Sequence, residues 1–344
     1  IKGEEIIFED VTVQSGLDKQ KGNSFPTWFW DHDNDGWLDI FTCDYTFNRS
    51  LSFYTAAENL NIPMGNSEKM LLYKNNRDGT FTNVANDLGL NKNVFSMGAN
   101  FGDIDNDGFL DMYLGTGNPD YKSLIPNKMF KNISGEKFAD VTNAARVGHL
   151  QKGHGVSFAD MDNDGDQDIY IDMGGAYVGD AYQNSFFLNP GQNDNSWICL
   201  TLEGTKSNRS AIGTQVKITF KENGASRSVY RDVNSGGSFG ASPLRRETGL
   251  GKATMIDKIE IKWHGSNELQ VFRNVAPNQF IKITEGHTQL ETVNLKTLQW
   301  TLPDKTLHHH SLNDPRLNRH ERWGSDMATL KVADIAGQQV ELDR

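Results

Sequence analysis

Acidic residues recur at a fixed spacing in three short segments of the chain. The segments are DHDNDGWLD from Asp31, DIDNDGFLD from Asp103 and DMDNDGDQD from Asp160. Each places carboxylates at positions 1, 3, 5 and 9 of a tight turn, with glycine at position 6 where the backbone must bend sharply. Because four carboxylates so close together repel one another unless a cation neutralises them, the pattern predicts three cation sites and not three inert acidic turns.

The predicted ligand chemistry favours calcium. All the ligands are oxygen atoms, their number exceeds the few protein ligands that Mg²⁺ takes, and no Cys/His cluster of the zinc type accompanies them. An EF-hand loop would need Glu at position 12, where this chain has Thr42, Leu114 and Ile171. We therefore predict about three Ca²⁺ ions in a different loop design, with the position-7 carbonyl as a fifth ligand. The predicted ligands are Asp31, Asp33, Asp35, Asp39 and the Trp37 carbonyl; Asp103, Asp105, Asp107, Asp111 and the Phe109 carbonyl; and Asp160, Asp162, Asp164, Asp168 and the Asp166 carbonyl.

The loops lie inside a longer repeat of predicted short strands. Each unit opens on a phenylalanine, Phe8, Phe81 or Phe138, and reaches the first Asp of its loop 22 or 23 residues later. An apolar strand follows each loop, and a further strand ends in LYKNN, MFKN or FFLN. The first unit has 15 extra residues, which lie between Asp39 and Asn75. We expect this insertion to leave the rim of the first unit and to have a short helical centre.

Repeats of about 50 to 60 residues built from short strands are typical of β-propellers. The unit resembles the FG-GAP/VCBS calcium-binding repeat of integrin-alpha-type propellers, over residues 8 to about 189. The resemblance implies four-stranded blades in which the calcium loop joins two strands. We expect a first domain of residues 1–188, with units of about 8–76, 77–133 and 134–189. Three units imply an incomplete propeller, completed either by blades before residue 1, which we favour, or by degenerate units and the second module.

After residue 189 the acidic loops stop while the strand pattern continues. Residues 215–220 (QVKITF), 258–263 (KIEIKW) and 280–284 (FIKIT) alternate polar and apolar side chains, which predicts strands that bury one face. The runs LEGTKSNRSAIGTQVKI, SGGSFGASPLRRETGLGKATMIDKIEIKWHGS and NVAPNQFIKITEG resemble the ASPIC/UnbV domain, which follows FG-GAP repeats in the cartilage acidic protein-like family. The resemblance covers residues 189–286 and implies a second β-rich domain, so the chain is predicted to be all-β.

Polar residues in the glycine-rich loops of this second module are candidates for binding, although turn chemistry and strand-end capping are the favoured interpretation. They are Asn208, Arg209, Ser238, Arg245 and Arg246.

The composition of the chain narrows its possible functions and its possible cellular locations. The formal charge of −11 comes with no basic run, which argues against nucleic-acid binding, and no apolar stretch approaches the ~18 residues of a membrane-spanning helix. Cys43 and Cys199 are predicted to be buried thiols, with a disulfide as the less favoured alternative. Because cytosolic free calcium is too low to fill ordinary extracellular-type sites, we expect the protein to be secreted, periplasmic or at the cell surface.

These features favour a non-enzymatic extracellular recognition or adhesion module that binds a protein or a glycan. Its binding residues are predicted in variable aromatic and Asn/Gly-rich loops. These are the loop around Tyr121, the loop around Tyr177 and Tyr182, and the inserted segment that bears Tyr45 and Tyr54. Packing at the rim is the simpler interpretation of any single tyrosine.

Catalysis is the weaker hypothesis, because nearly all the clustered carboxylates are assigned to calcium. His32 lies at a non-ligand position of its loop. The other candidates, which have no recognisable acidic or nucleophilic partner in the sequence, are His149, His154, His264 and His287.

Residues 287–344 match neither module. The histidines at 308–310 and His320 could form a metal site, but a solvated polar linker around Asn313 and Pro315 is the simpler interpretation. The closing segment ATLKVADIAGQQVELDR alternates as a β-hairpin and resembles the opening hairpin of peroxiredoxin-like domains. The alternative function is therefore a targeting or scaffold portion of a larger secreted enzyme, continuing past Arg344 into a thioredoxin-fold domain.

Overall fold

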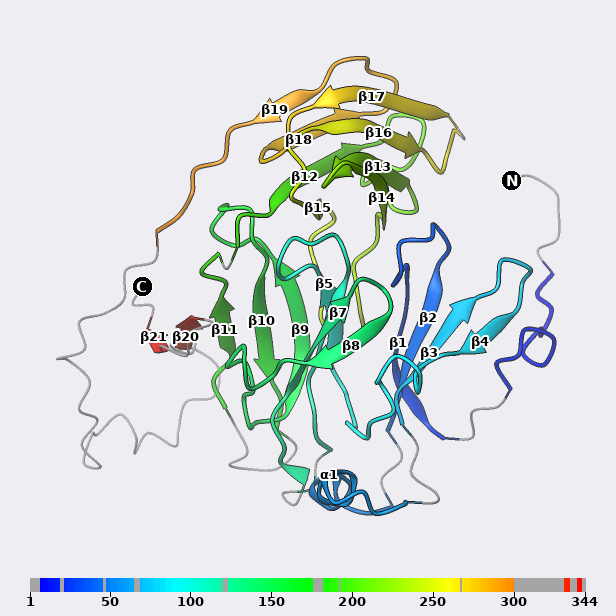
Figure 1. The fold of residues 1–344 in the computed structure, drawn as a ribbon, viewed down its shortest axis with the longest axis vertical. Coiled ribbons are helices and arrows are strands. Elements are labelled where there is room, and N and C mark those ends of the chain that lie inside the picture. The colour runs from blue at the N-terminus through cyan, green and yellow to red at the C-terminus, as the bar shows by residue number, and fades with distance from the viewer. Residues whose placement is uncertain are drawn as a thin grey trace.

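The computed structural model describes residues 7–18, 22–45, 48–64, 69–118, 120, 123–175, 182–191, 193–266, 268–299, 331–334 and 339–341. Within this part of the chain the regular structure is antiparallel and parallel β-sheet with one short helix. Three blade-like sheets lie side by side beneath a two-sheet sandwich (Figure 1). The all-β class predicted from the sequence is confirmed.

Each of the first two blades is an antiparallel sheet in chain order, and an acidic loop joins its first two strands. Blade 1 contains β1 (Ser24–Trp30), β2 (Asp39–Asp44), β3 (Leu71–Asn75) and β4 (Phe81–Asn83). Blade 2 contains β5 (Ala99–Gly102), β6 (Asp111–Leu114), β7 (Lys128–Ile133) and β8 (Lys137–Asp140). Both therefore place the loop at the same end of the sheet, toward the sandwich.

Blade 3 receives its outer strands from the far end of the chain. It begins with β9 (Gly153–Ala159), β10 (Asp168–Met173) and β11 (Ser185–Leu188), after which the chain leaves for the sandwich. The strand β20 (Lys331–Asp334) pairs in parallel with β11, and β21 (Gln339–Glu341) pairs antiparallel with β20. The hairpin predicted in the tail therefore forms as an extension of this blade, while the histidines at 308–310 and 320 lie outside the described residues.

The sequence repeat and the blades are out of phase by one strand. Phe81 and Phe138, which open repeat units, lie in β4 and β8, the outer strands of the preceding blades. The Phe81 N–H donates to the Ser15 carbonyl at 2.9 Å, and the Phe138 N–H donates to the Leu88 carbonyl at 2.8 Å. Successive units are therefore held together by backbone hydrogen bonds in the same way.

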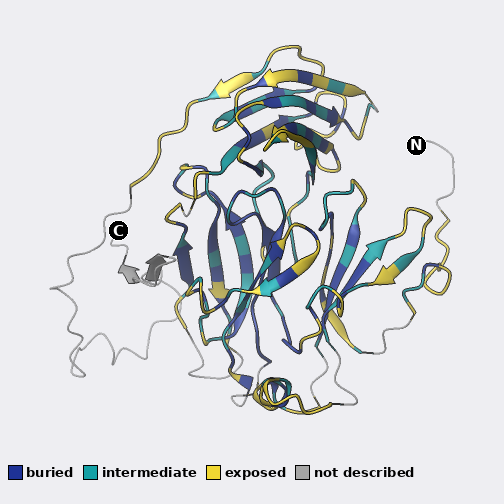
Figure 2. Cartoon of the chain, in the orientation of Figure 1, coloured by how far each residue is buried: buried dark blue, intermediate teal, exposed yellow. Residues whose placement is uncertain are grey.

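Apolar side chains fill the spaces between neighbouring blades. In β6 all four residues are buried, because Met112 and Leu114 pack into the cluster shared with blade 1 while Tyr113 packs into the cluster shared with blade 3. This alternation follows from the two-residue period of a strand. Trp28 and Trp30 on β1 are large buried side chains of the first cluster. Figure 2 shows the buried residues running through all three blades and the sandwich.

The insertion of the first unit contains the helix α1 (Leu51–Asn59), as the sequence predicted. Its N-cap is Ser50, whose hydroxyl accepts the Phe53 N–H at 3.3 Å. Tyr54 and Leu51 pack with Phe95 in a small apolar cluster at the end of the blades away from the sandwich (Figure 1).

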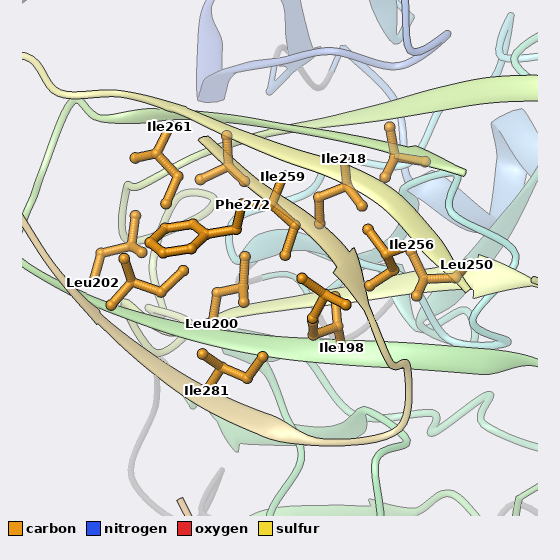
Figure 3. Close-up of a cluster of buried hydrophobic side chains, with 14 of the residues drawn as sticks. Ile198, Leu200, Leu202, Ile218, Leu250, Ile256, Ile259, Ile261, Phe272 and Ile281 are labelled. Carbon is orange, nitrogen blue, oxygen red and sulfur yellow. The ribbon is translucent and has the colours of Figure 1, made fainter. Parts of the chain in front are cut away.

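The sandwich consists of two four-stranded sheets. One has the order β15 (Arg246–Gly251), β12 (Ser196–Glu203), β18 (Phe280–Thr284) and β19 (Glu291–Val293). The other has the order β14 (Ala225–Asp232), β13 (Gln215–Glu222), β16 (Ile256–Lys262) and β17 (Leu269–Val275). Ile218 and Ile259 face Leu200 and Ile198 across the core (Figure 3), so the alternation predicted for these strands is confirmed.

A loop of the sandwich, residues 234–243, extends along the first strands of all three blades. Ser238 and Ala99 on β5 exchange two backbone hydrogen bonds of 2.8 Å, and the Val156 N–H on β9 donates to the Phe239 carbonyl at 2.8 Å. The Phe239 ring stacks on Phe25 of β1, with ring centroids 5.0 Å apart. The described blades form an open arc, and the sandwich contributes this loop to the space along their first strands.

Cys43 and Cys199 are buried free thiols, and burial raises the pKa of Cys43 to about 12. Among the described residues, no helix combines the length and the apolar character needed to cross a membrane.

Candidate metal centres

The three acidic loops share one backbone conformation. Asparagine at position 4 has φ of 56°, 55° and 59° in the first, second and third loop, and glycine at position 6 has φ of 87°, 90° and 99°. Both positions lie in the left-handed region, which glycine adopts freely and asparagine tolerates better than most residues. The resulting turn brings the carboxylates of positions 1, 3 and 5 toward one another.

The carboxylates at positions 1 and 9 are held by backbone amides. Asp31 accepts the N–H groups of Asp35 and Gly36 at 3.0 and 2.8 Å. Asp39, at position 9, accepts the Asn75 N–H of β3 at 2.8 Å. The equivalent carboxylates of the other loops accept the N–H groups of residues 132 and 189 at 2.7 and 2.8 Å. These hydrogen bonds fix the orientation of the acidic side chains before any cation binds.

Several carboxylate oxygens in the loops remain without a donor. They are buried and have no hydrogen-bond partner: Asp33 Oδ1, Asp103 Oδ1, Asp105 Oδ1 and Asp162 Oδ1. In addition, one oxygen from each carboxylate of a group lies within 4.8 Å of the others, in the groups Asp31, Asp33 and Asp35; Asp103, Asp105 and Asp111; and Asp160, Asp162 and Asp164. Buried oxygens that converge without donors are suited to a hard cation, so these clusters could bind calcium.

Burial raises the pKa of many of these carboxyl groups. It raises the pKa of Asp31 to about 7, although the Gly36 N–H opposes the shift, and the charge of Asp33 adds to it. Burial also raises the pKa of Asp168 to about 8 and that of Asp111 well above its ordinary value. A bound divalent cation would favour the charged forms and remove this penalty.

A lysine reaches the first two loops but not the third. Lys74 in β3 forms an ion pair with Asp33, and Lys131 in β7 forms one with Asp105. The equivalent position in β11 is Leu188. The third loop also has a fifth acidic side chain at position 7, so it is the most negative of the three. The same difference is visible in the sequence, where the segments LYKNN and MFKN have a lysine and FFLN has a leucine before the asparagine.

His32 lies against two predicted ligands of the first loop. Its Nδ1 contacts Asp39 Oδ2, and its side chain groups with Asp33 and Asp39. The residue is 1% exposed. The equivalent residues of the other loops, Ile104 and Met161, offer only backbone N–H groups to the position-9 carboxylate. The sequence interpretation of His32 as a non-ligand stays a prediction.

Side-chain amides connect the loops into a row. Asn34 Nδ2 of the first loop donates to the Gly108 carbonyl of the second at 2.9 Å. Asn106 Nδ2 of the second loop donates to the Gly165 carbonyl of the third at 3.1 Å. Position 4 of the first loop therefore contacts position 6 of the second, and position 4 of the second contacts position 6 of the third, so movement of one loop would displace its neighbour.

The sandwich packs directly on the second loop. Arg231 of β14 is 6% exposed, and its guanidinium lies 3.3 Å from Asp103 Oδ2 and 3.1 Å from the Gly108 carbonyl. The Gly249 N–H of β15 donates to the same Asp103 oxygen at 3.0 Å. Burial lowers the pKa of Arg231, and the charge of Asp103 opposes that shift. A position-1 carboxylate is thus shared between the predicted cation site and the second domain.

The first and third loops are covered by the sandwich as well. The Tyr230 N–H donates to Asn34 Oδ1 at 3.2 Å. At the third loop, a Cβ on Gly165 would lie 1.9 Å from the Trp197 ring, so only glycine permits this contact. Arg245 donates to the Asp160 carbonyl and to Glu247. Surfaces covered in this way are not free to contact a macromolecular partner.

The polar residues singled out in the second module have structural contacts. Asn208 closes a turn by bonding both the N–H and the carbonyl of Ile212, at 2.9 and 2.8 Å. Arg246 donates to backbone carbonyls of residues 232, 234, 243 and 244. Arg209 is exposed beside Glu203 at 3.2 Å. Of the predicted tyrosines, Tyr54 is a buried residue of α1, while residues 121 and 177 lie outside the described part of the chain.

Comparisons with known proteins place two family models on the chain. Residues 31–114 match the FG-GAP-like repeat, and residues 204–290 match the domain described as ASPIC and UnbV. No curated protein sequence matches the chain. A solved structure of a candidate cell adhesion protein from Bacteroides ovatus is 9% identical, covering 52% of this chain and 80% of its own, with a TM-score of 0.19. A likeness at that TM-score carries no argument about fold or function.

Proposed function

Because the chain is an FG-GAP repeat protein with an ASPIC/UnbV domain, we propose that it is a calcium-stabilised extracellular recognition module of the adhesion type. One observation carries the proposal. Each acidic loop contains a buried carboxylate oxygen with no hydrogen-bond donor, on a backbone that is the same in all three loops. A cation is the partner that such oxygens lack.

The donor set fits calcium better than the alternatives. Among the described residues the converging groups are carboxylates, joined by His32 in the first loop, with no thiolate, and the loops offer more protein oxygens than Mg²⁺ takes when it keeps its waters. We assign one Ca²⁺ to each loop, held by the carboxylates of positions 1, 3, 5 and 9 and the position-7 carbonyl. The ion would supply positive charge and rigidity, not reaction chemistry, so the proposed module is non-enzymatic.

Calcium at these loops would stabilise the junction of the two domains. Asp103 receives Arg231 and the Gly249 N–H from the sandwich, so its orientation matters to both domains. A ligand that binds only the native state at 1,000 times its Kd stabilises by about 4 kcal/mol. Micromolar sites in millimolar extracellular calcium reach that ratio, which supports an extracellular location for the module.

The recognition surface should lie at the opposite end of the blades. The sandwich covers the acidic loops, whereas the second strand of each blade ends on the side away from it. Connecting loops on a rigid scaffold are common binding surfaces. The ligand would be an extracellular protein or a glycan.

Retention on an array of glycans and extracellular matrix proteins tests this function. The calcium-loaded chain is expected to bind a subset of the array, and the same chain in EGTA should lose that binding together with its fold. A matched sample with Mg²⁺ in place of Ca²⁺ controls for divalent charge. If calcium-loaded and chelated protein give the same pattern, the calcium-dependent part of the proposal is wrong; if the loaded protein binds nothing, its recognition part is wrong.

A further inference from the structure

An apolar cavity of about 220 Å³ lies between blades 2 and 3. We call it the interblade cavity. Its walls are mostly aliphatic: Met129 of β7, Val147 and Ile169 of β10 line it, each 1% exposed, together with Ala145. The ion pair of Lys131 with Asp105 also lines it. The cavity therefore combines a large apolar volume with a single pair of opposite charges.

The repeat explains why a cavity forms at this place. Ala145 occupies the position that Leu88 holds one unit earlier in the chain. Both segments fold alike, because the Leu88 N–H donates to the Val84 carbonyl at 3.1 Å and the Ala145 N–H donates to the Val141 carbonyl at 2.8 Å. Leu88 packs against the apolar cluster between blades 1 and 2, and Ala145 packs against the cluster between blades 2 and 3. Alanine lacks most of the leucine side chain, so the second interface keeps a space that the first one fills.

An aliphatic cavity of this size suits an apolar ligand better than water. A buried water needs two to four polar partners, which aliphatic walls do not supply. An engineered cavity of ~150 Å³ with apolar walls stays dry and binds benzene, so a cavity of about 220 Å³ can hold an aliphatic chain of roughly six to eight carbons. Such a chain would also restore the dispersion contacts that the walls lack.

Lys131 gives the cavity a charged edge. Its ammonium group carries three N–H donors, of which one bonds Asp105 Oδ2, while Asp107 Oδ2 lies 3.9 Å away. The Lys131 side chain is 29% exposed and Ala144 is exposed, so a ligand can enter from solvent beside them. Asp105 and Asp107 are predicted calcium ligands. A calcium ion held by them would neutralise the negative charge that Lys131 faces, which leaves a cation at the edge of an apolar cavity.

We propose that the interblade cavity of the calcium-loaded protein binds a free aliphatic carboxylate of medium chain length, such as hexanoate or octanoate. The chain lies against Met129, Val147 and Ile169, and the carboxylate pairs with Lys131. The proposal rests on the calcium sites of the proposed function. It adds a small-molecule site that is separate from the surface for an extracellular protein or glycan.

Size and charge separate this ligand from related molecules. Acetate has the charge but no chain to fill the cavity. Hexan-1-ol fills the cavity but makes no ion pair with Lys131. Hexylammonium fills it and brings a like charge, which Lys131 and the calcium ion repel. The volume is below the ~300–1,000 Å³ of sites for drug-sized ligands, so a long-chain fatty acid would leave most of its chain in water.

The first test titrates the full chain, loaded with calcium, with sodium hexanoate by calorimetry or NMR. Hexanoate is expected to bind saturably, with acetate, hexan-1-ol and hexylammonium each at least tenfold weaker. Affinity should rise from acetate through butanoate to hexanoate. A series that does not rise with chain length, or hexan-1-ol that binds as tightly as hexanoate, refutes the proposal.

The second test changes the walls and the charge separately. Ala145→Leu, which introduces the residue of the preceding unit, should weaken hexanoate binding at least tenfold. Asn143→Leu places the same side chain at an exposed position nearby and should leave the binding unchanged. Lys131→Met should weaken hexanoate at least tenfold and leave hexan-1-ol unchanged. Lys137→Met, at an exposed lysine of β8, should change neither.

Circular dichroism with and without calcium shows whether each variant is folded, and Ala145→Val replaces Ala145→Leu if the latter unfolds. A chain that keeps its calcium-dependent stability but binds no hexanoate, or binds it equally after the cavity is filled, refutes the interblade site without affecting the proposed calcium role. Hexanoate binding of equal strength in calcium and in EGTA would contradict the calcium dependence of the site.

Discussion

The two ends of the blade arc differ in what covers them. At one end, three loops gather buried carboxylates under the sandwich, with oxygens such as Asp33 Oδ1 that no donor reaches. At the other end, the strand ends line a cavity of about 170 Å³ that the sandwich does not cover. The covered end is suited to a structural cation, whereas the open end leaves connecting loops available to a partner. We therefore expect that stability and recognition can be changed separately, and the predictions below test the covered end.

Removing calcium should have the largest effect. Three sites at about 4 kcal/mol each, with roughly 2–4 °C of melting temperature per kcal/mol for domains of this size, predict a fall of about 20 °C or more in EGTA. Differential scanning calorimetry measures it. Calcium should restore the transition more effectively than the same concentration of Mg²⁺. A melting temperature that does not change on chelation would contradict calcium binding by the acidic loops.

Arg231→Met should destabilise the junction between the domains. Removing one partner of a buried ion pair costs about 3–5 kcal/mol when the other charge is left alone. In EGTA the Asp103 carboxylate would be left buried without its partner charge. Bound calcium would replace part of the lost electrostatic attraction. Urea unfolding should therefore show a larger loss in EGTA than in calcium. Arg209→Met is the control, because that side chain is 88% exposed and its surface pair is worth about 0–1 kcal/mol.

The pH dependence should reverse when calcium is added. Burial raises the folded pKa of Asp31 and Asp160 to about 7 and that of Asp168 to about 8, above the ordinary value of 3.8. The folded chain then holds more protons than the unfolded chain, so in EGTA stability is full below about pH 4 and falls as the pH rises toward 8. With calcium, the stabilisation by the ion should grow over the same range. Urea unfolding at pH 5 and pH 8, with and without calcium, gives both slopes; equal slopes would contradict cation binding at these carboxyls.

The features that the sequence predicted are those that depend on neighbouring residues in the chain. The acidic loops, the strands after them and the alternation in residues 215–220 are periodicities that a short window contains. The covering of the loops could not be predicted in this way, because Arg231 and Gly249 are 128 and 146 residues from Asp103. The same holds for the cavity of about 170 Å³ at the other end of the blades, because its lining residues, among them Tyr45, Asn118 and Lys152, come from different blades. The outer strand of blade 3 likewise comes from the far end of the chain.

The central claim is that each acidic loop binds one calcium ion, and equilibrium dialysis of the chelator-stripped chain against calcium tests it most directly. We expect three saturable ions per chain, retained against an equal concentration of Mg²⁺. Asp105→Asn, which weakens one ligand of the second loop, should leave two tightly bound ions. Asp140→Asn, at a carboxylate paired with Lys128 outside the loops, should leave three. Fewer than three saturable ions in the native chain, or equal binding of Mg²⁺, would contradict the account.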